Sequence, residues 1–265
     1  MREENHEKIQ AFEPQENLIY GKNAVTELLK SGEAVDTLYM AEGLNPALAG
    51  YYTAMAKEAG AVVKRLHPQK LKAMCGTEHH QGVACYAATV AYHELSELME
   101  LARESGRPPF FVLADGIEDP HNLGAVMRSA LLFGAHGLVI PRRGGVGVTP
   151  VVHKASAGAS MRLPIARVAN IATAVRTLKS NNVFVYCADM DGEPAFRQNL
   201  TGAIALVVGS EGKGVSPLVK SLCDGVVGIP MAAGVETEVD SLNVSVAAGV
   251  VMYEILRQRT EKEKG

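Results

Sequence analysis

The chain has 265 residues and a formal net charge of −3, with 47% hydrophobic and 21% charged residues. This length suits two domains, and the composition is that of a globular protein, not of a disordered or fibrous one. The longest apolar stretches are interrupted by glycine or polar residues and are too short to cross a bilayer. Because the chain as a whole is not basic, any nucleic-acid binding must depend on local clusters of Lys and Arg.

Residues 1–16 are rich in charged and polar side chains and contain no apolar stretch of the signal-peptide type. We therefore expect a disordered tail and a cytoplasmic protein. The four cysteines show no C-x-x-C pairing; they are Cys75, Cys85, Cys187 and Cys223. A chain of this size does not need disulfide bonds, so reduced and mostly buried thiols are expected.

The first half of the chain, residues 17–92, has the pattern of a small α/β domain. After a short lead at 17–20, the expected helices are Ala24–Lys30, Pro46–Ala59 and Pro68–Met74, and the expected strands are Val35–Met40, Ala61–Leu66 and Gly82–Thr89. Gly32 and Gly60 follow the first two helices as terminators, and a proline opens the third. Residues 93–109, a helix His93–Ser105 followed by Gly-Arg-Pro-Pro, are expected to connect two domains.

From residue 110 to 265 the pattern changes to short strands separated by helices. The expected strands are Phe110–Ala114, Gly137–Ile140, Leu163–Val168, Val183–Ala188, Ile204–Val208 and Val226–Ile229. The expected helices are Pro120–Phe133, Pro150–Ser160, Ile171–Ser180, Pro217–Cys223 and Asn243–Arg259. Several of the strands are almost wholly apolar, which is typical of strands that are covered on both faces. The pattern therefore predicts an α/β fold with a mainly parallel sheet.

A parallel sheet first suggests a nucleotide-dependent enzyme of Rossmann type, but the turns do not support it. The turn after the first strand, residues 115–122, lacks the G-x-G-x-x-G pattern that places a pyrophosphate on a helix N-terminus. Residues 209–214 are glycine-rich, yet they lack Walker A spacing and its Lys-Ser/Thr pair. Glu211 would also repel a phosphate there. NAD or ATP binding is therefore disfavoured.

Three short segments at strand–helix junctions carry the most information: NLGAVMR at 122–128, GSEG at 209–212 and SLNVS at 241–245. Open parallel sheets place their ligand sites at such junctions. Together the segments resemble the three motifs of the SpoU (TrmH-type) RNA ribose 2'-O-methyltransferases. In the first half, IYGKNAV at 19–25 and HHQGV at 79–83 are similar to the small L30e-like RNA-binding domain that precedes the catalytic domain in a large subgroup.

The resemblance spans roughly Asn17 to Arg259 and implies a fold, a cofactor and an assembly. The second domain would be a SPOUT-type α/β domain with a deep trefoil knot, a rare exception to unknotted connectivity. S-adenosylmethionine would be the cofactor, RNA the substrate, and a homodimer with a site built across two subunits the working form. The closing helix would then pack between subunits, and its apolar residues include Val246, Val250, Tyr253 and Ile255.

The resemblance implies catalytic roles for Arg128, Asn122, Glu211, Ser241 and Asn243. Methyl transfer needs an aligned 2'-oxygen and a destination for its proton, and the fork of Arg128 could orient phosphate and hydroxyl together. Guanidinium is a poor general base because it stays protonated. Without the other motifs, a helix-surface arginine in an ion pair would be the favoured interpretation of Arg128. Glu211 alone could be a solvated loop acid. Ser241 is also a suitable N-cap for the last helix.

The resemblance also assigns the binding residues. Backbone groups of Gly209, Ile229 and Leu242 would hold the adenine, in loops that include Val208 and Met231. A neutral purine requires fixed amides and an apolar slot, not charge. The segment 231–240 is longer than expected for close relatives, and its acids Glu236, Glu238 and Asp240 would lie beside the cofactor loop.

RNA contacts are expected from basic and histidine residues in both halves: Lys22, Lys64, Arg65, His80 and Arg142. Scattered Lys and Arg could also simply balance the acidic residues. The pair His79-His80 could suggest a metal, yet no further His or Cys stands at ligand spacing, so no metal is expected. An RNA contact or packing explains these histidines better.

The expected function is therefore S-adenosylmethionine-dependent methylation of a ribose 2'-hydroxyl, most simply of a guanosine in 23S ribosomal RNA. Methylation of tRNA is an alternative that the sequence separates poorly. A non-catalytic RNA-binding or ribosome-assembly factor is another, although the retained polar residues of the three motifs argue against it.

Overall fold

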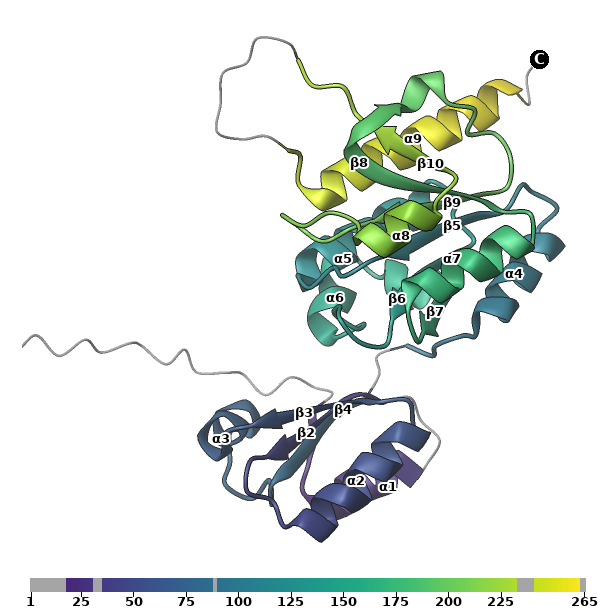
Figure 1. Cartoon of the computed structure of the whole chain (residues 1–265). Coiled ribbons are helices and arrows are strands. Elements are labelled where there is room, and N and C mark those ends of the chain that lie inside the picture. The colour runs from purple at the N-terminus through teal and green to yellow at the C-terminus, as the bar shows by residue number, and fades with distance from the viewer. Residues whose placement is uncertain (1–17, 31–34, 88–89, 233–240, 263–265) are drawn as a thin grey trace, which may run out of the picture. The chain divides into compact units, whose positions relative to one another are not determined.

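The computed structural model describes residues 18–30, 35–87, 90–232 and 241–262 (Figure 1). The chain forms two compact units, Met1–Ala88 and Thr89–Gly265. The expected tail 1–16 and the acids Glu236, Glu238 and Asp240 lie outside the described residues. No helix in the described ranges combines the length and apolar character needed to cross a bilayer.

Unit 1 is built on a four-stranded sheet with the order β1-β4-β2-β3. Its strands are β1 (Leu18–Tyr20), β2 (Val35–Ala41), β3 (Val62–Leu66) and β4 (Val83–Ala87), and only β2 and β3 run parallel to each other among the paired strands. Helices α1 (Lys22–Lys30) and α2 (Pro46–Glu58) share one core with β2 and β4. Helix α3 (Pro68–Cys75) packs Leu71 and Cys75 into a second core.

Unit 2 is built on a six-stranded sheet with the order β10-β8-β9-β5-β6-β7, in which every pairing is parallel. The strands are β5 (Phe110–Ala114), β6 (Gly137–Pro141), β7 (Ile165–Val168), β8 (Phe184–Pro194), β9 (Ile204–Val208) and β10 (Gly225–Gly228). The predicted parallel α/β sheet is therefore confirmed. Because all strands point the same way, the loops after them gather at one edge of the sheet.

Helices cover both faces of this sheet, as the apolar strands predicted (Figure 1). On one face, α5 (Pro120–Leu132), α6 (Pro150–Ala155) and α9 (Val244–Lys262) contribute to one core. On the other, α4 (Leu95–Glu104), α7 (Ile171–Ser180) and α8 (Pro217–Leu222) contribute to a second. The expected helix 150–160 ends early, since Ala157 and Gly158 adopt positive φ angles of 50° and 84°; a short 3₁₀ turn, Ala159–Met161, follows.

Helix α4 lies within the segment 93–109 that the sequence suggested as a connector. Leu95, Leu98 and Ala102 are buried in the second core of unit 2. The main chain of His93 also forms a parallel bridge with Ala166 in β7. This segment is thus packed as part of unit 2 and is not a plain linker, because its apolar face finds a partner there.

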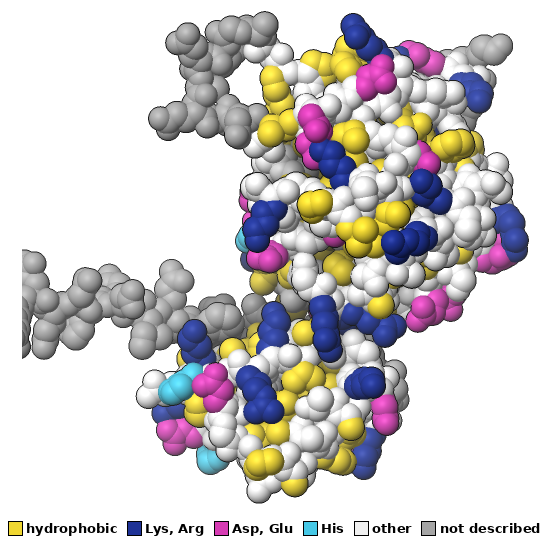
Figure 2. Space-filling view, in the orientation of Figure 1, with side chains coloured by type: hydrophobic (Ala, Val, Ile, Leu, Met, Phe, Trp, Pro, Cys, Tyr) yellow, Lys and Arg dark blue, Asp and Glu magenta, His cyan; other side chains and the backbone are white. Residues whose placement is uncertain are grey.

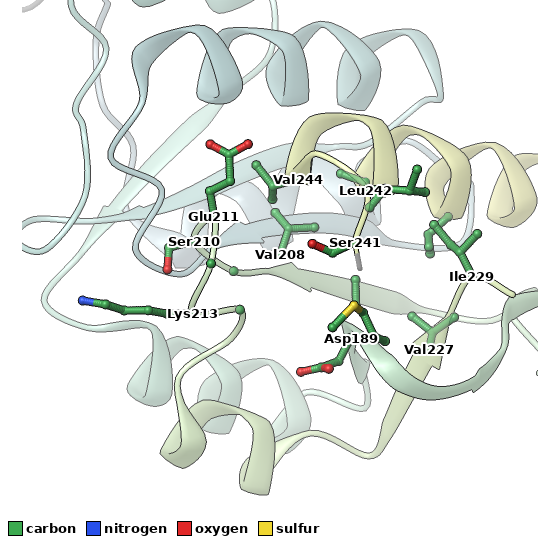
Figure 3. A pocket seen from close by; sticks show the side chains of 18 of the residues that line it. Asp189, Val208, Ser210, Glu211, Lys213, Val227, Ile229, Ser241, Leu242 and Val244 are labelled. Carbon is green, nitrogen blue, oxygen red and sulfur yellow. The ribbon is translucent and has the colours of Figure 1, made fainter. Parts of the chain in front are cut away.

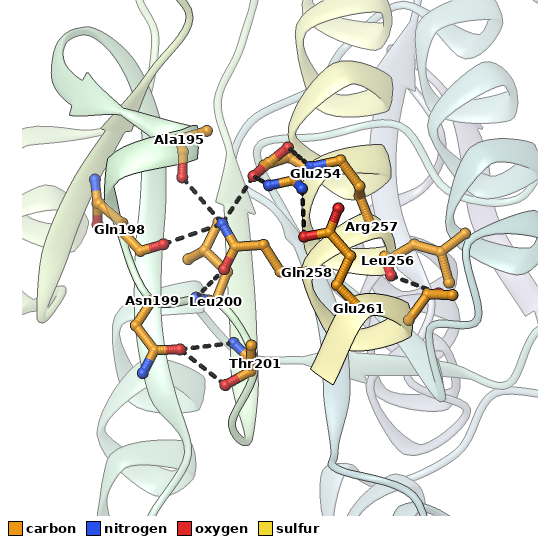
Figure 4. Close-up of polar contacts among 11 residues, drawn as sticks. Ala195, Gln198, Asn199, Leu200, Thr201, Glu254, Leu256, Arg257, Gln258 and Glu261 are labelled. Atoms are coloured by element: carbon orange, nitrogen blue, oxygen red, sulfur yellow. Dashed lines mark hydrogen bonds and ion pairs between the residues drawn. The ribbon is translucent and has the colours of Figure 1, made fainter. Parts of the chain in front are cut away.

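The C-terminal half of α9 is fastened to the chain between β8 and β9 (Figure 4). Gln258 donates from Nε2 to the carbonyl of Gln198 at 3.0 Å and accepts at Oε1 from the backbone N–H of Leu200 at 2.8 Å. Arg259 donates to the carbonyls of Pro108, Pro109 and Gly202. These bonds join side chains of α9 to backbone groups of two other segments, so they hold the end of α9 in register.

Candidate functional site

A cavity of about 240 Å³ opens at the edge of the sheet where β8, β9 and β10 end (Figure 3). Its wall combines the middle of β8, the loop after β9, the segment after β10 and the start of α9. The lining residues that matter below are Asp189, Val208, Gly209, Glu211, Ile229, Met231, Ser241 and Leu242. The five residues expected to bind the cofactor, Val208, Gly209, Ile229, Met231 and Leu242, therefore meet in one place.

The loop after β9 folds tightly back on itself. The backbones of Ser210 and Gly214 exchange two hydrogen bonds of 3.0 and 2.9 Å. At Gly209 an added Cβ would stand 2.0 Å from the carbonyl carbon of Gly214, so no side chain fits there. Glycine is thus required at 209 by close approach of backbone, which leaves main-chain groups exposed to the cavity.

Asn122, Glu211 and Asn243 form a hydrogen-bonded cluster that joins the three sequence motifs. Asn122 donates from Nδ2 to Glu211 Oε2 at 3.2 Å, and Asn243 donates to Glu211 Oε1 at 2.7 Å and to Asn122 Oδ1 at 2.9 Å. Asn122 is 7% exposed. Both partners of the carboxylate are neutral amides, so they orient Glu211 on the cavity wall without cancelling its charge.

Asn243 also caps helix α9, a role that the sequence suggested for Ser241. Its Oδ1 accepts from the backbone N–H of Ser245 at 2.9 Å and from the hydroxyl of that residue at 2.7 Å. The helix begins at Val244, which makes Asn243 the residue at the N-cap position. The N-cap assignment to Ser241 was wrong because the helix starts later; Ser241 lines the cavity instead.

Arg128 stands apart from this cluster. It is exposed on α5 and, within the part of the chain that the structure describes, makes no hydrogen bond or ion pair. It does not line the cavity. Glu211 is held by the amides of Asn122 and Asn243, and within one chain it makes no contact with the guanidinium of Arg128.

A charged group that sequence reasoning missed lies on the opposite side of the cavity. Asp189, in the middle of β8, lies 2.9 Å from Lys220 Nζ through its Oδ2. Lys220 also donates to both carboxylate oxygens of Asp191 at 2.8 and 3.0 Å. Burial works against ionisation of Asp189, but the hydrogen bond and charge of Lys220 outweigh it and lower the pKa of that carboxyl. The bonds from Asp191 and Asp189 raise the pKa of Lys220. The available signal was the polar run D-M-D directly after an apolar strand.

The residues expected to contact RNA are distributed over both units. In unit 1, Lys64 and Arg65 are exposed on the edge strand β3. The backbone N–H of Lys22 donates to Gln81 Oε1 at 2.9 Å, which places Lys22 beside the turn 79–82. Figure 2 shows that Lys and Arg side chains gather on the visible face of this unit.

Two of the expected RNA contacts are already engaged within the protein. His80 is 9% exposed and accepts at Nδ1 from the backbone N–H of Gly82, and burial lowers its pKa. This favours the packing interpretation of His80 over an RNA contact. In unit 2, Arg142 donates to the carbonyl of Arg167 and lies 3.8 Å from Glu94. Among the described residues, no cluster of His, Cys, Asp and Glu could hold a metal ion.

Comparison with known proteins gives consistent results for both units. Residues 109–253 match the SpoU rRNA Methylase family, and residues 18–93 match the RNA 2'-O ribose methyltransferase substrate binding family. The chain is 44% identical over 247 residues to "Putative TrmH family tRNA/rRNA methyltransferase YacO" of Bacillus subtilis, covering 92% of this chain and 97% of that protein. It is 36% identical over 243 residues to a Staphylococcus haemolyticus protein of the same description, covering 91% and 96%.

Two solved structures of methyltransferases in this family align with the chain. The SpoU methyltransferase AviRb from Streptomyces viridochromogenes, in complex with the cofactor AdoMet, aligns with a TM-score of 0.56 and 25% identity, covering 92% of this chain and 90% of that one. The A. aeolicus TrmH/SpoU tRNA modifying enzyme aligns with a TM-score of 0.52 and 27% identity over 64% of this chain and 86% of that one.

Proposed function

The chain belongs to the SpoU rRNA methylase family, and from this premise we propose that it transfers a methyl group from S-adenosylmethionine to a ribose 2'-hydroxyl of RNA. One observation carries the proposal: the residues expected at the cofactor converge on one cavity, and Glu211 on its wall is tied to Asn122 and Asn243. The proposed substrate is a guanosine in 23S ribosomal RNA, handled in the cytoplasm. The names of the relatives keep tRNA open as an alternative.

The cavity suits S-adenosylmethionine because its apolar side chains and its main-chain groups match the adenine of that molecule. Ile229 and Leu242 supply apolar surface for a flat purine, and main-chain groups of the loop at Gly209 are available to its polar edge. Bound there, S-adenosylmethionine would supply an activated methyl group. The domain limits 17–92 and 110–265 and the trefoil knot belong to the same proposal.

The residues of the three motifs would align the acceptor. Glu211, oriented by two amides, would accept a hydrogen bond from the acceptor nucleotide, and Ser241 and Asn243 would border the same space. The methyl group would leave the donor's sulfur as the 2'-oxygen bonds to its carbon, and the hydroxyl proton would pass to a phosphate oxygen or to water. Arg128 would hold the nucleotide's phosphate and ribose hydroxyl. Because it does not line the cavity of its own chain, we assign it to the cavity of a second copy.

The distribution of apolar side chains on α9 supports a homodimer through this helix. Val246, Val250 and Tyr253 are 51%, 43% and 55% exposed and stand at i, i+4 and i+7, one stripe of the helix. Ile255, the fourth apolar residue named from the sequence, is 1% exposed and packs in the core of its own chain. Such a stripe is typical of an interface.

Placing a charge in this stripe is expected to separate the subunits. Tyr253→Glu would have to desolvate a carboxylate in the interface, so the variant should sediment as a monomer and lose methyl transfer, since Arg128 would no longer reach a partner's cavity. Leu218→Glu, on α8 and 57% exposed before substitution, is the matched control and should remain dimeric. Sedimentation velocity of wild type and both variants checks this; a dimeric Tyr253→Glu protein would move the interface elsewhere.

Removing the basic pair on β3 is expected to weaken RNA binding without changing the cavity. Replacing Lys64 and Arg65 with alanine should reduce the slope of log K against log[salt] by roughly 1 to 2, because each lost phosphate contact releases one counterion fewer. Replacing the exposed Lys30 and Lys57 of α1 and α2 is the charge-matched control. Equal slopes for both double variants would remove β3 from the RNA interface.

The proposed reaction is tested by incubating the protein with labelled S-adenosylmethionine and total RNA, followed by alkaline hydrolysis. A ribose methyl group protects its phosphodiester from base, so label should appear in resistant dinucleotides of one RNA species. Label in mononucleotides would show base methylation instead. A non-catalytic RNA-binding factor would bind RNA but leave it unlabelled, and a parallel titration with the donor would separate that case from a missing substrate.

A further inference from the structure

Among the described residues that line the cavity, Asp189 is the carboxylate that the three motifs leave unassigned. It lies in the middle of β8, just past Cys187, where the pairing of β8 with β9 ends. Its side chain is 23% exposed, and that of its partner Lys220 is 27% exposed. Glu211 belongs to a different segment and is tied to Asn122 and Asn243, where the acceptor nucleotide is proposed to lie. Figure 3 shows these two carboxylates on different sides of the cavity. Asp189 is thus available to a part of the donor that does not react.

We propose that Asp189 binds the ribose hydroxyls of the methyl donor. This inference rests on the proposed function, since it assigns a residue to the donor cavity. Adjacent hydroxyl groups are donors that match the two oxygens of one carboxylate. The same pairing of an acidic side chain with a nucleoside ribose occurs at the strand ends of dinucleotide-binding sheets.

The ion pair with Lys220 favours hydroxyl groups over the donor's ammonium group as the partner of Asp189. Lys220 Nζ stands 2.9 Å from Oδ2 of Asp189 and keeps that carboxylate ionised and fixed. A second ammonium group on the same carboxylate would lie close to the charge of Lys220 and be repelled. Neutral hydroxyl groups bring no such repulsion, and the hydrogen bonds they donate to an ionised acceptor are strong.

Lys220 acts through Asp189 and is a positioning residue. Lys220 joins α8 to β8 by bonding both acids, so it sets where the carboxylate of Asp189 stands. Asp191 does not line the cavity, and its side chain is 70% exposed. The chain therefore contains a matched control: Asp191→Asn makes the same chemical change in the same ion cluster, away from the proposed ribose site.

The test is calorimetric titration of the full-length protein with two ligands. S-adenosylmethionine carries adenine, ribose and the amino-acid end, whereas 5'-methylthioadenosine lacks the amino-acid end. Asp189→Asn is expected to raise the Kd of both ligands by the same factor, about 10 to 100, because one or two hydrogen bonds to a charged group are lost. Asp191→Asn should change either value by less than about threefold. Thermal melting of each variant checks the fold, and Asp189→Glu, which keeps the charge but moves it, gives a second variant that should also weaken both ligands.

Two results would overturn the assignment. If Asp189→Asn weakened the binding of S-adenosylmethionine but not that of 5'-methylthioadenosine, the carboxylate would contact the amino-acid end of the donor and not its ribose. If neither Asp189→Asn nor Asp189→Glu changed either affinity, Asp189 would not contact the donor, while the proposed function would stand. A wild-type protein that bound no donor at all would instead overturn the proposed function.

Discussion

Replacing Arg128 with alanine is expected to abolish methyl transfer while leaving the fold and the affinity for the donor intact. Arg128 is exposed and makes no polar contact within the described residues, so its loss removes nothing that holds the chain together. A fork that orients both phosphate and hydroxyl would be absent, and the rate should fall by at least about 10²-fold, the typical effect of removing a charged positioning or transition-state group.

Single-turnover methylation with saturating donor measures this effect, and calorimetry of donor binding serves as the companion measurement. Arg176→Ala, on the exposed side of α7, is a matched control that should behave like wild type. Mixing Arg128→Ala subunits with subunits that carry a defective cavity tests whether the residue acts across the dimer. Partial recovery of activity in the mixture is expected; wild-type turnover by Arg128→Ala alone would refute its assigned role.

Replacing Glu211 with glutamine is expected to reduce methyl transfer about 10²-fold and to lower stability by about 1 kcal/mol. Glu211 accepts a hydrogen bond at each carboxylate oxygen from Asn122 and Asn243. A glutamine side chain keeps one oxygen acceptor but places an NH₂ group against the NH₂ group of Asn122 or Asn243. One hydrogen bond of this partly buried cluster must therefore break. Both the orientation of the side chain and its charge at the acceptor nucleotide are lost.

Two further substitutions separate the causes. Glu118→Gln, an exposed acid in the loop after β5 at the same edge of the sheet, controls for the loss of one negative charge and should leave the rate unchanged. Asn243→Ser keeps a side chain suited to capping α9 but cannot reach both Glu211 and Asn122. It should therefore lose activity while α9 stays capped, and the loss of the hydrogen bond to the buried Asn122 should lower the melting temperature slightly. Full activity of Asn243→Ser would show that the cluster is a helix cap and nothing more.

The sheet of unit 2 was predictable because its strands are short apolar runs bounded by glycine or charged residues. The bounds of β5, β9 and α7 agree with the expected ranges to the residue. Strand β8 was expected to end at Ala188 but continues to Pro194, since its polar end pairs with β10 after a register shift between Val226 and Val227. The polar residues after Ala188 are typical of a turn, so the sequence does not predict that β8 continues. The extension depends on pairing with β10.

The cavity was predicted by motif and topology together, whereas its details depended on backbone geometry. Gly209, Ile229 and Leu242 lie far apart in sequence and meet because they follow parallel strands or precede α9. Ser241 and Asn243 are both good capping residues, so the sequence could not decide which one caps the helix. Asp189 belongs to no motif, and its position became visible only from its neighbours Lys220 and Gly214.

Because Asn243 both caps α9 and bonds to Glu211, it couples the cavity to this helix. The same side chain fixes the first turn of α9 and holds Glu211, while Tyr253 lies farther along the same rigid element and Gln258 anchors its end. A helix transmits a displacement at one end along its whole length. If two copies pack along α9, donor binding in one cavity would change the donor affinity of the other. The binding isotherm should then deviate from that of two independent sites.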